Sequence, residues 1–305
     1  MCSKNLSALV ETLIYITASV IIKLTSITPI RYLAWAGRQI GRLAWYIDRR
    51  HRLVAIVNIE AAFPELNTDA CINLSKKNFQ RLGETYACIL KTGGMNAEQI
   101  NNLLSFKGYE QIEEIFKNDP EARVILAIGH YGNFELFSWI GLGAPSAKPA
   151  TTYRALRQPK LTELMLKLRA NSGCLYFERR TEGIKLQDAL KTPHIVLGLL
   201  ADQNAGKGGL WLPVFGRETS VSPAPAIFAK RYNCHLFPSA CFRIRSGQWL
   251  IELGKEIPVI ENGLRRSTVS ITRDIISAQE QTIRRDPANW FWVHNRWKPR
   301  QVKHS

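Results

Sequence analysis

The chain has 305 residues, of which 46% are hydrophobic and 22% are charged. These values are ordinary for a globular protein that buries a core, so a disordered chain is not expected. Lysine and arginine number 41 against 25 aspartates and glutamates, a formal net charge of +16. The resulting positive field attracts acidic partners such as nucleic acid, anionic lipid or an acidic protein, and charge alone does not choose among them.

The cysteines predict neither a metal cluster nor a disulfide framework. The six are Cys2, Cys71, Cys88, Cys174, Cys234 and Cys241. They contain no C-x-x-C pair, whereas zinc sites and disulfide scaffolds have close and regular spacings. Most of them lie in apolar surroundings that suit small core residues, and a reducing compartment fits this usage best.

An apolar segment runs from Leu6 to Ile30, close to the ~20 residues that a helix needs to cross a bilayer. Glu11 and Lys23 interrupt it. A cleaved signal peptide is disfavoured, because an acidic residue precedes the apolar core and no clear A-x-A site follows. We expect a marginal membrane-spanning helix, with a buried helix as the alternative.

The next segment, residues 31–52, alternates arginine with tryptophan and tyrosine. Cations beside anionic head groups contribute about 1 kcal/mol each, and aromatic rings favour the membrane interface. We therefore predict a basic interfacial helix and an N-terminal membrane anchor over residues 1–50, which would leave the rest of the chain in the cytoplasm. A solvated basic helix is the alternative. Nucleic acid is not an expected partner, because RNA-binding motifs are missing.

Residues 51–120 are predicted to form a helical lead-in. The stretch 67–90 starts with capping residues, has amphipathic spacing and ends before two glycines, which is typical of a helix. A further helix is expected around residues 108–120, where Pro120 stops it. This lead-in would connect the membrane anchor to the remainder of the chain.

From residue 121 onward, short apolar runs alternate with helical stretches. Strands are predicted at 123–129, 149–155, 174–179, 194–202, 235–244 and 248–254, and a closing helix at 268–285. Repeated strand and helix signals argue for a sheet with helices on its faces. We predict an α/β domain over residues 121–305, with a mixed sheet flanked by helices.

His130 directly follows the first of these strands, where ligands of open α/β sheets gather. Asn133 can cap the next helix, which would place Glu135 in its first turn, where the helix dipole favours a carboxylate. A Glu135 within reach of one imidazole nitrogen would fix the tautomer of His130 and leave the other nitrogen as a general base. The alternative is a loop histidine and a glutamate that only caps a helix. Metal binding is disfavoured, because the five-residue offset does not place two ligands on one helix face.

The His-x-x-x-x-Glu arrangement in "GHYGNFE" resembles the first motif of the lysophospholipid acyltransferase superfamily, where the acidic residue is often aspartate. The closer resemblance is to the lipid A biosynthesis acyltransferases, the late lauroyl and myristoyl transferases, which use glutamate. From Asn58 onward, further stretches are similar to that family in the same order: "NIEAAFPEL", "KNFQRLGETYACIL", "TTYRAL", "ADQNAGKGG" and "PANWFWVHNRWKPR". The resemblance implies a glycerolipid-acyltransferase-like fold and catalytic roles for His130 and Glu135.

The same resemblance implies a fatty acyl thioester on acyl carrier protein as donor and a hydroxyl of a phosphorylated glucosamine lipid as acceptor. It also implies that the enzyme needs no cofactor and acts at the cytoplasmic face of a bacterial inner membrane. Both substrates are acidic, so both would benefit from the net charge of +16. The alternatives are an acyltransferase for a glycerolipid or another lysolipid, and a non-enzymatic basic membrane-binding protein.

Several residues match substrate-binding positions of that family. They are Arg154, Arg169, Asp202 and either Arg179 or Arg180. The planar fork of arginine can bond two phosphate oxygens at once, although a solvated basic face remains the alternative. Asp202 ends a strand and is predicted to hold a substrate hydroxyl or an arginine, or only to form a turn. His294, which lies among tryptophans, is expected to pack rather than to act as an acid or base.

Overall fold

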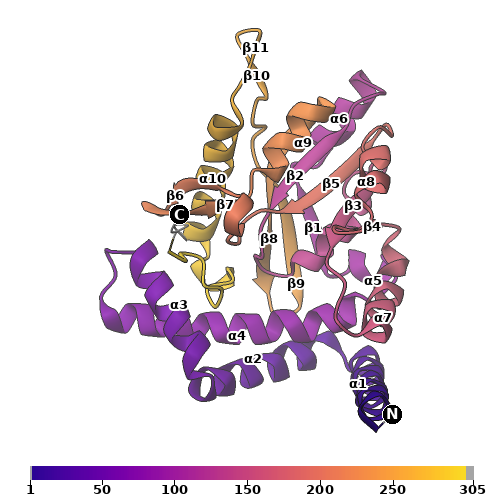
Figure 1. Cartoon of the computed structure of the whole chain (residues 1–305), viewed down its shortest axis with the longest axis vertical. Helices are drawn as coiled ribbons and strands as arrows, with labels where there is room; N and C mark the ends of the chain where they lie inside the picture. The colour runs from indigo at the N-terminus through magenta and orange to yellow at the C-terminus, as the bar shows by residue number, and fades with distance from the viewer. Residues whose placement is uncertain (1, 300–305) are drawn as a thin grey trace.

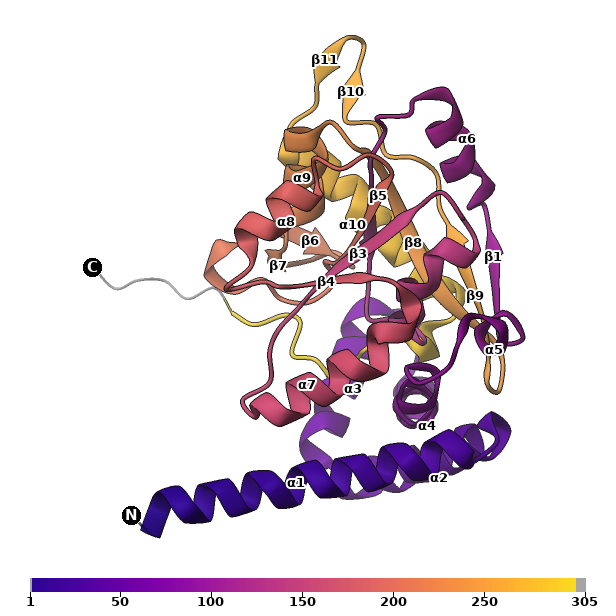
Figure 2. The same cartoon turned by 90° about the vertical axis from the view of Figure 1, so that its right-hand side faces the viewer.

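The computed structural model describes residues 2–299, with side chains from residue 11 onward. The side chain of Cys2 lies outside the described part of the chain, as do the ends of the expected anchor and α/β domain at residues 1 and 300–305. Helices lead into the sheet in the order α1 (Cys2–Ile27), α2 (Ile30–Ile47), α3 (Arg49–Ala62), α4 (Thr68–Thr92) and α5 (Ala97–Asn101). In Figures 1 and 2, α1 and α2 lie along one side of the molecule, beneath α4.

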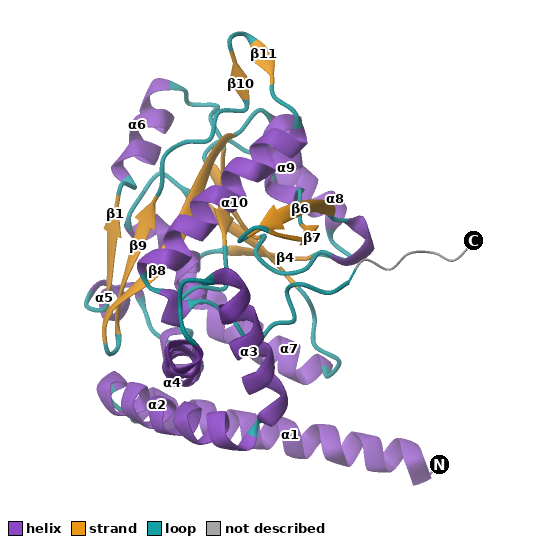
Figure 3. Cartoon of the chain, turned by 90° about the vertical axis from the view of Figure 1, so that its left-hand side faces the viewer, coloured by secondary structure: helices purple, strands orange, loops and turns teal. Residues whose placement is uncertain are grey.

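Within residues 2–299, seven strands form one mixed sheet in the order β1-β9-β8-β2-β5-β3-β4. The strands are β1 (Leu104–Lys107), β2 (Val124–Ile128), β3 (Lys148–Tyr153), β4 (Leu175–Glu178), β5 (Ile195–Leu200), β8 (His235–Arg245) and β9 (Gln248–Leu253). Neighbouring strands are parallel except β8 and β9, which form an antiparallel hairpin. The predicted α/β fold with a mixed sheet flanked by helices is therefore confirmed (Figure 3).

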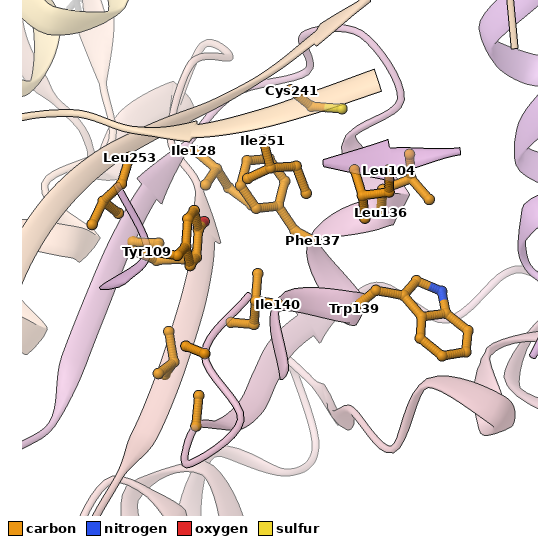
Figure 4. Close-up of a cluster of buried hydrophobic side chains, with 14 of the residues drawn as sticks. Leu104, Tyr109, Ile128, Leu136, Phe137, Trp139, Ile140, Cys241, Ile251 and Leu253 are labelled. Atoms are coloured by element: carbon orange, nitrogen blue, oxygen red, sulfur yellow. The ribbon is translucent and has the colours of Figure 1, made fainter. Parts of the chain in front are cut away.

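The central strand β2 is buried along its whole length, which explains its continuous apolar run. Its even-numbered side chains join a core beneath α5, α6 (Glu110–Asn118) and the 3-10 helix η1 (Phe134–Leu142). Figure 4 shows Phe137 and Ile140 of η1 among Ile128 and Ile251 of the sheet. The odd-numbered side chains of β2 face α8 (Gly183–Ala189), α9 (Ala224–Tyr232) and α10 (Thr268–Arg285). The sheet is thus covered on both faces, and its strand ends remain available for a site.

A separate apolar cluster joins the lead-in helices to the end of the chain. Phe63, directly after α3, and Phe79, in α4, pack with Trp290 and Trp292. The hairpin of β6 (Leu210–Val214) and β7 (Arg217–Val221) covers the same cluster. The remaining elements are the hairpin β10 (Ile260–Glu261) with β11 (Leu264–Arg265), helix α7 (Pro159–Arg169), and the short turns η2 (Ala170–Ser172), η3 (Gly206–Gly208) and η4 (Pro287–Asn289).

Helix α2 packs on α4 through small residues. A Cβ on Gly37 would lie 2.4 Å from the carbonyl oxygen of Gly83, and a Cβ on Gly83 would lie 2.1 Å from that of Gly37. Glycine costs roughly 1 kcal/mol in a helix interior relative to alanine, so this backbone contact explains its presence. Because the small residues face the protein, the large apolar side chains of α2, such as Trp35 and Ile40, are exposed.

The expected N-terminal membrane-spanning helix is not supported. Within residues 2–299, no helix combines the length and hydropathy that a bilayer crossing requires. Glu11 and Lys23 both lie within α1 and lower its hydropathy.

Candidate active site

The strand register brings His130 and Asp202 together. Ile128 at the end of β2 pairs with Leu200 at the end of β5, so the residues two positions further along each strand are also neighbours. Both side chains therefore arise at the carboxyl-terminal edge of the sheet, which is the usual binding edge of an α/β fold. The fold itself, rather than proximity along the chain, creates this pair.

Asp202 holds the imidazole of His130. Its Oδ1 lies 2.8 Å from Nδ1 of His130, and its Oδ2 accepts the backbone N–H of His130 at 2.8 Å. The structure corrects the expected pairing here, because Glu135 was predicted to make this contact. A carboxylate at Nδ1 favours the tautomer that carries a proton there, so Nε2 is left as a proton acceptor.

Glu135 pairs with Arg169 instead. Nε of Arg169 donates to one carboxylate oxygen at 2.9 Å, and a terminal guanidinium nitrogen donates to the other at 2.6 Å. This two-point pairing joins η1 to the end of α7. Glu135 lies in the first turn of η1, as expected for its position, but Asn133 at the N-cap makes no capping side-chain hydrogen bond there.

Burial and charge act in opposite directions on the pair. Burial disfavours the charged imidazole, but the charge and hydrogen bond of Asp202, together with the charge of Glu135, outweigh it and raise the pKa of His130 above its ordinary value. Burial alone would raise the pKa of the Asp202 carboxyl, yet the contacts from His130 and Trp290 hold that pKa below its usual range. The pair is therefore built to carry an ionised carboxylate beside a basic imidazole.

A polar cavity of about 660 Å³ opens in front of His130. Arg154, Arg169 and Arg179 contribute to its lining, together with Glu135. The register of β3 and β4 pairs Tyr153 with Glu178, so Arg154 and Arg179 follow at neighbouring strand ends.

The structure distinguishes the two adjacent arginines that the sequence left open. Both arginines are exposed on the turn after β4, but Arg179 lines the polar cavity and Arg180 does not. The backbone N–H of Arg180 donates to the carboxylate of Glu178. Most of the predicted site residues are thus brought around one cavity, with Asp202 buried behind His130. The exception is Arg180.

An apolar groove of about 290 Å³ adjoins the polar cavity. Its walls come from α4, η1 and α7, and they include Ile89, Trp139 and Leu168. Glu135 and Arg169 line both spaces, so their ion pair stands at the junction. A substrate with one polar end and one apolar tail would fit the two spaces together.

The C-terminal strap, which we define as residues 286–297, supplies contacts that the sequence did not predict. The indole N–H of Trp290 donates to Oδ2 of Asp202 at 2.8 Å. His294 accepts the backbone N–H of Asn204 through Nε2, so its ring supports the loop after β5. Burial and the nearby Lys298 lower the pKa of His294. The structural role expected for His294 agrees with these contacts.

The fold and site define an α/β protein whose strand ends hold a basic histidine between a cationic cavity and an apolar groove. Within the described residues, no group of three or more histidines, cysteines, aspartates or glutamates is placed to hold a metal ion. The family model described as bacterial lipid A biosynthesis acyltransferase matches residues 2–299. Because the match covers nearly the whole chain, the chain belongs to this family and is an acyltransferase. No curated protein matches the chain.

Proposed function

We propose that the protein transfers a fatty acyl chain from acyl carrier protein to a hydroxyl of a phosphorylated glucosamine lipid, a late acylation in lipid A biosynthesis. The observation that carries this proposal is the position of His130, which is held by Asp202 at the mouth of a cationic cavity with an apolar groove beside it. The cavity would take the polar reacting ends of both substrates. The groove would take a hydrocarbon chain.

In the proposed reaction, Nε2 of His130 accepts the proton of the acceptor hydroxyl while its oxygen attacks the thioester carbonyl. The carboxylate of Asp202 stabilises the imidazolium that forms. When the tetrahedral intermediate collapses, the carbon–sulfur bond breaks and the imidazolium returns the proton to the leaving thiolate. Backbone amides and an arginine of the cavity would stabilise the oxyanion.

The cationic lining suits the acidic substrates. Arg154 and Arg179 follow neighbouring strand ends and would bind phosphate groups of the acceptor, for which guanidinium is well shaped. Glu135 and Arg169 would hold η1 against α7 and keep the groove continuous with the cavity. We propose a role in binding for the ion pair and an indirect role for the charge of Glu135, which favours the imidazolium through space.

An acceptor and donor exchange tests this function. Purified protein is given acyl carrier protein loaded with a radiolabelled fatty acyl chain, together with either a phosphorylated glucosamine lipid or a lysophosphatidic acid, and the labelled product ester is separated by thin-layer chromatography. We expect product with the glucosamine lipid. Product only with the glycerolipid would replace this proposal by the alternative substrate class, and a parallel reaction with acyl-coenzyme A tests the carrier protein as donor.

We also propose that the exposed faces of α1 and α2 contact the cytoplasmic surface of the bacterial inner membrane. Ile21, Leu24, Trp35 and Leu43 are among the large apolar side chains exposed there. Arg31, on the same pair of helices, is also exposed, and anionic head groups attract such cations. A membrane would cover apolar area that the protein leaves in water.

The double substitution Ile40→Ser with Leu43→Ser is expected to weaken binding to vesicles of anionic phospholipid about tenfold or more, because two apolar side chains lose burial in the interface. Cosedimentation with vesicles measures the effect. The matched control replaces Ile184 and Leu264 by serine. These residues are 77% and 74% exposed and lie in α8 and β11, away from α2 (Figure 2), so this variant should bind as the wild type does. Equal loss of binding in both double variants would contradict the assignment of this surface.

A further inference from the structure

Asp202 has a second fixed partner besides the imidazole. Its Oδ2 accepts the indole N–H of Trp290 and the backbone N–H of His130, each at 2.8 Å, which leaves Oδ1 for Nδ1 of His130. Trp290 is only 4% exposed. One oxygen of this buried carboxylate, Oδ2, is therefore held by Trp290 and the backbone, and the other, Oδ1, bonds the imidazole.

The C-terminal strap that carries Trp290 is tied to the strand end at several points. Tyr131 forms a β-bridge with Trp290, and the N–H of Gly132 donates to the carbonyl of Asn289 at 3.0 Å. The hydroxyl of Tyr131 donates to the carbonyl of Asp286 at 2.9 Å. The strap thus runs directly beside the loop that contains His130.

Two buried asparagines fasten the strap from the other side. The side-chain amide of Asn78, in α4, donates to the carbonyls of Ala288 at 2.8 Å and Trp290 at 2.6 Å. That of Asn58, in α3, donates to the carbonyls of Trp292 at 2.7 Å and His294 at 2.8 Å. Backbone carbonyls buried without a donor would be costly. These contacts explain why polar side chains occur on buried faces of α3 and α4.

We propose that Trp290 is a positioning residue for His130, with Asn78 holding Trp290 in place. This inference rests on the proposed role of His130 as the base. The indole N–H draws negative charge of Asp202 toward Oδ2, while the backbone N–H of His130 keeps Oδ1 aligned with Nδ1, so the indole sets how strongly the carboxylate stabilises the imidazolium. The helical lead-in is thereby connected to the reaction through the strap, without touching a substrate.

The proposal makes a prediction for the titration of His130. Charged and titratable groups reach its ring from several elements: Asp202 after β5, Glu135 on η1 and His294 in the strap. Removing one donor from Asp202 concentrates negative charge on the oxygen that faces the imidazole. The imidazolium is then better stabilised, so the pKa of His130 should rise by about 0.5–1 unit, since two to three such bonds lower a carboxyl pKa by about two units.

The test compares Trp290→Phe with Trp292→Phe in the full chain. Trp292 is fully buried in the same cluster, but its indole donates to the carbonyl of Pro287 and not to Asp202. Both substitutions remove an indole and leave a similar gap. The pKa of His130 is read from its imidazole resonances by NMR across pH, in protein whose folding is checked by circular dichroism.

We expect the pKa of His130 to rise in Trp290→Phe and to stay at the wild-type value in Trp292→Phe. Equal values in all three proteins, or equal shifts in both variants, would overturn the proposal. If Trp290→Phe does not fold, the pKa of His130 is measured in Asn78→Ser instead. That variant keeps the indole but loses the amide that holds the backbone of Trp290. A folded Asn78→Ser with an unchanged pKa would also overturn the proposal, and a smaller upward shift would support it.

This titration does not depend on turnover. If His130 is not the base, the shift would still appear while acyl transfer by His130→Ala would continue, so the two failures are distinguishable. If both proposals hold, Trp290→Phe should also move the acid limb of kcat to higher pH, because the base must be neutral to accept a proton. A purely structural role for Trp290 would lower thermal stability without moving that limb.

Discussion

His130→Ala is expected to lower the rate of acyl transfer by about 10²–10⁴-fold, the range that general-base catalysis supplies. The side chain is 19% exposed, faces the polar cavity and contacts Asp202. Its removal takes one partner from the buried carboxylate of Asp202 and so lowers stability, but the backbone N–H of residue 130 and the indole of Trp290 still hold that carboxylate. Single-turnover transfer of a radiolabelled acyl chain from acyl carrier protein measures the rate, and circular dichroism checks the fold.

A second histidine–carboxylate pair provides the control for that variant. Nδ1 of His235 lies 2.7 Å from Glu256, and His235 pairs in register with Val124 at the start of β2. This pair is therefore at the opposite edge of the sheet from His130. His235→Ala should transfer acyl chains at the wild-type rate, whereas near wild-type turnover by folded His130→Ala would rule out the proposed base.

Asp202→Asn is expected to have the second large effect, a loss on the order of 10²–10⁴-fold in the same assay. An asparagine amide facing Nδ1 favours the wrong tautomer, in which Nε2 carries the proton and cannot accept another. The substitution also removes the charge that opposes burial, so the pKa of His130 should fall. The remaining activity should then extend to lower pH, and pH–rate profiles of both proteins measure this shift.

Glu135→Gln distinguishes the effect of the Glu135 charge on His130 from the direct contact that Asp202 makes with the imidazole. Glu135 reaches His130 through its charge, while its oxygens bind Arg169. The pKa of His130 should therefore fall less in Glu135→Gln than in Asp202→Asn. A larger fall in Glu135→Gln would show that the glutamate, and not Asp202, is the main partner of the imidazole.

The contrast between these carboxylates shows what the sequence could and could not predict. The apolar run of β2 predicted a strand, and His130 was correctly placed at its end. The predicted partner of its imidazole, Glu135, was wrong, because it was chosen as the nearest carboxylate along the chain; the observed partner is Asp202. Which residues meet across a sheet depends on strand register, and the pairing of Ile128 with Leu200 is a tertiary fact that local patterns do not contain.

Other differences between the predicted and the observed elements have similar physical causes. Strand β1 has only four residues at the sheet edge, which is too short for a periodic signal. The hairpin of β6 and β7 follows a glycine-rich stretch and was not predicted. The clustering of Trp290 and Trp292 near the end of the chain indicated packing, which the structure shows. The contact of Trp290 with Asp202 spans 88 positions and left no local signal.

Mass spectrometry of lipid A from cells tests the central claim most directly. Cells that lack the protein are supplied with the wild type, with His130→Ala or with His235→Ala, each at equal protein level. We predict that the wild type and His235→Ala add one fatty acyl chain to the lipid, whereas His130→Ala leaves its mass unchanged. An added acyl chain of equal abundance with His130→Ala would contradict the account.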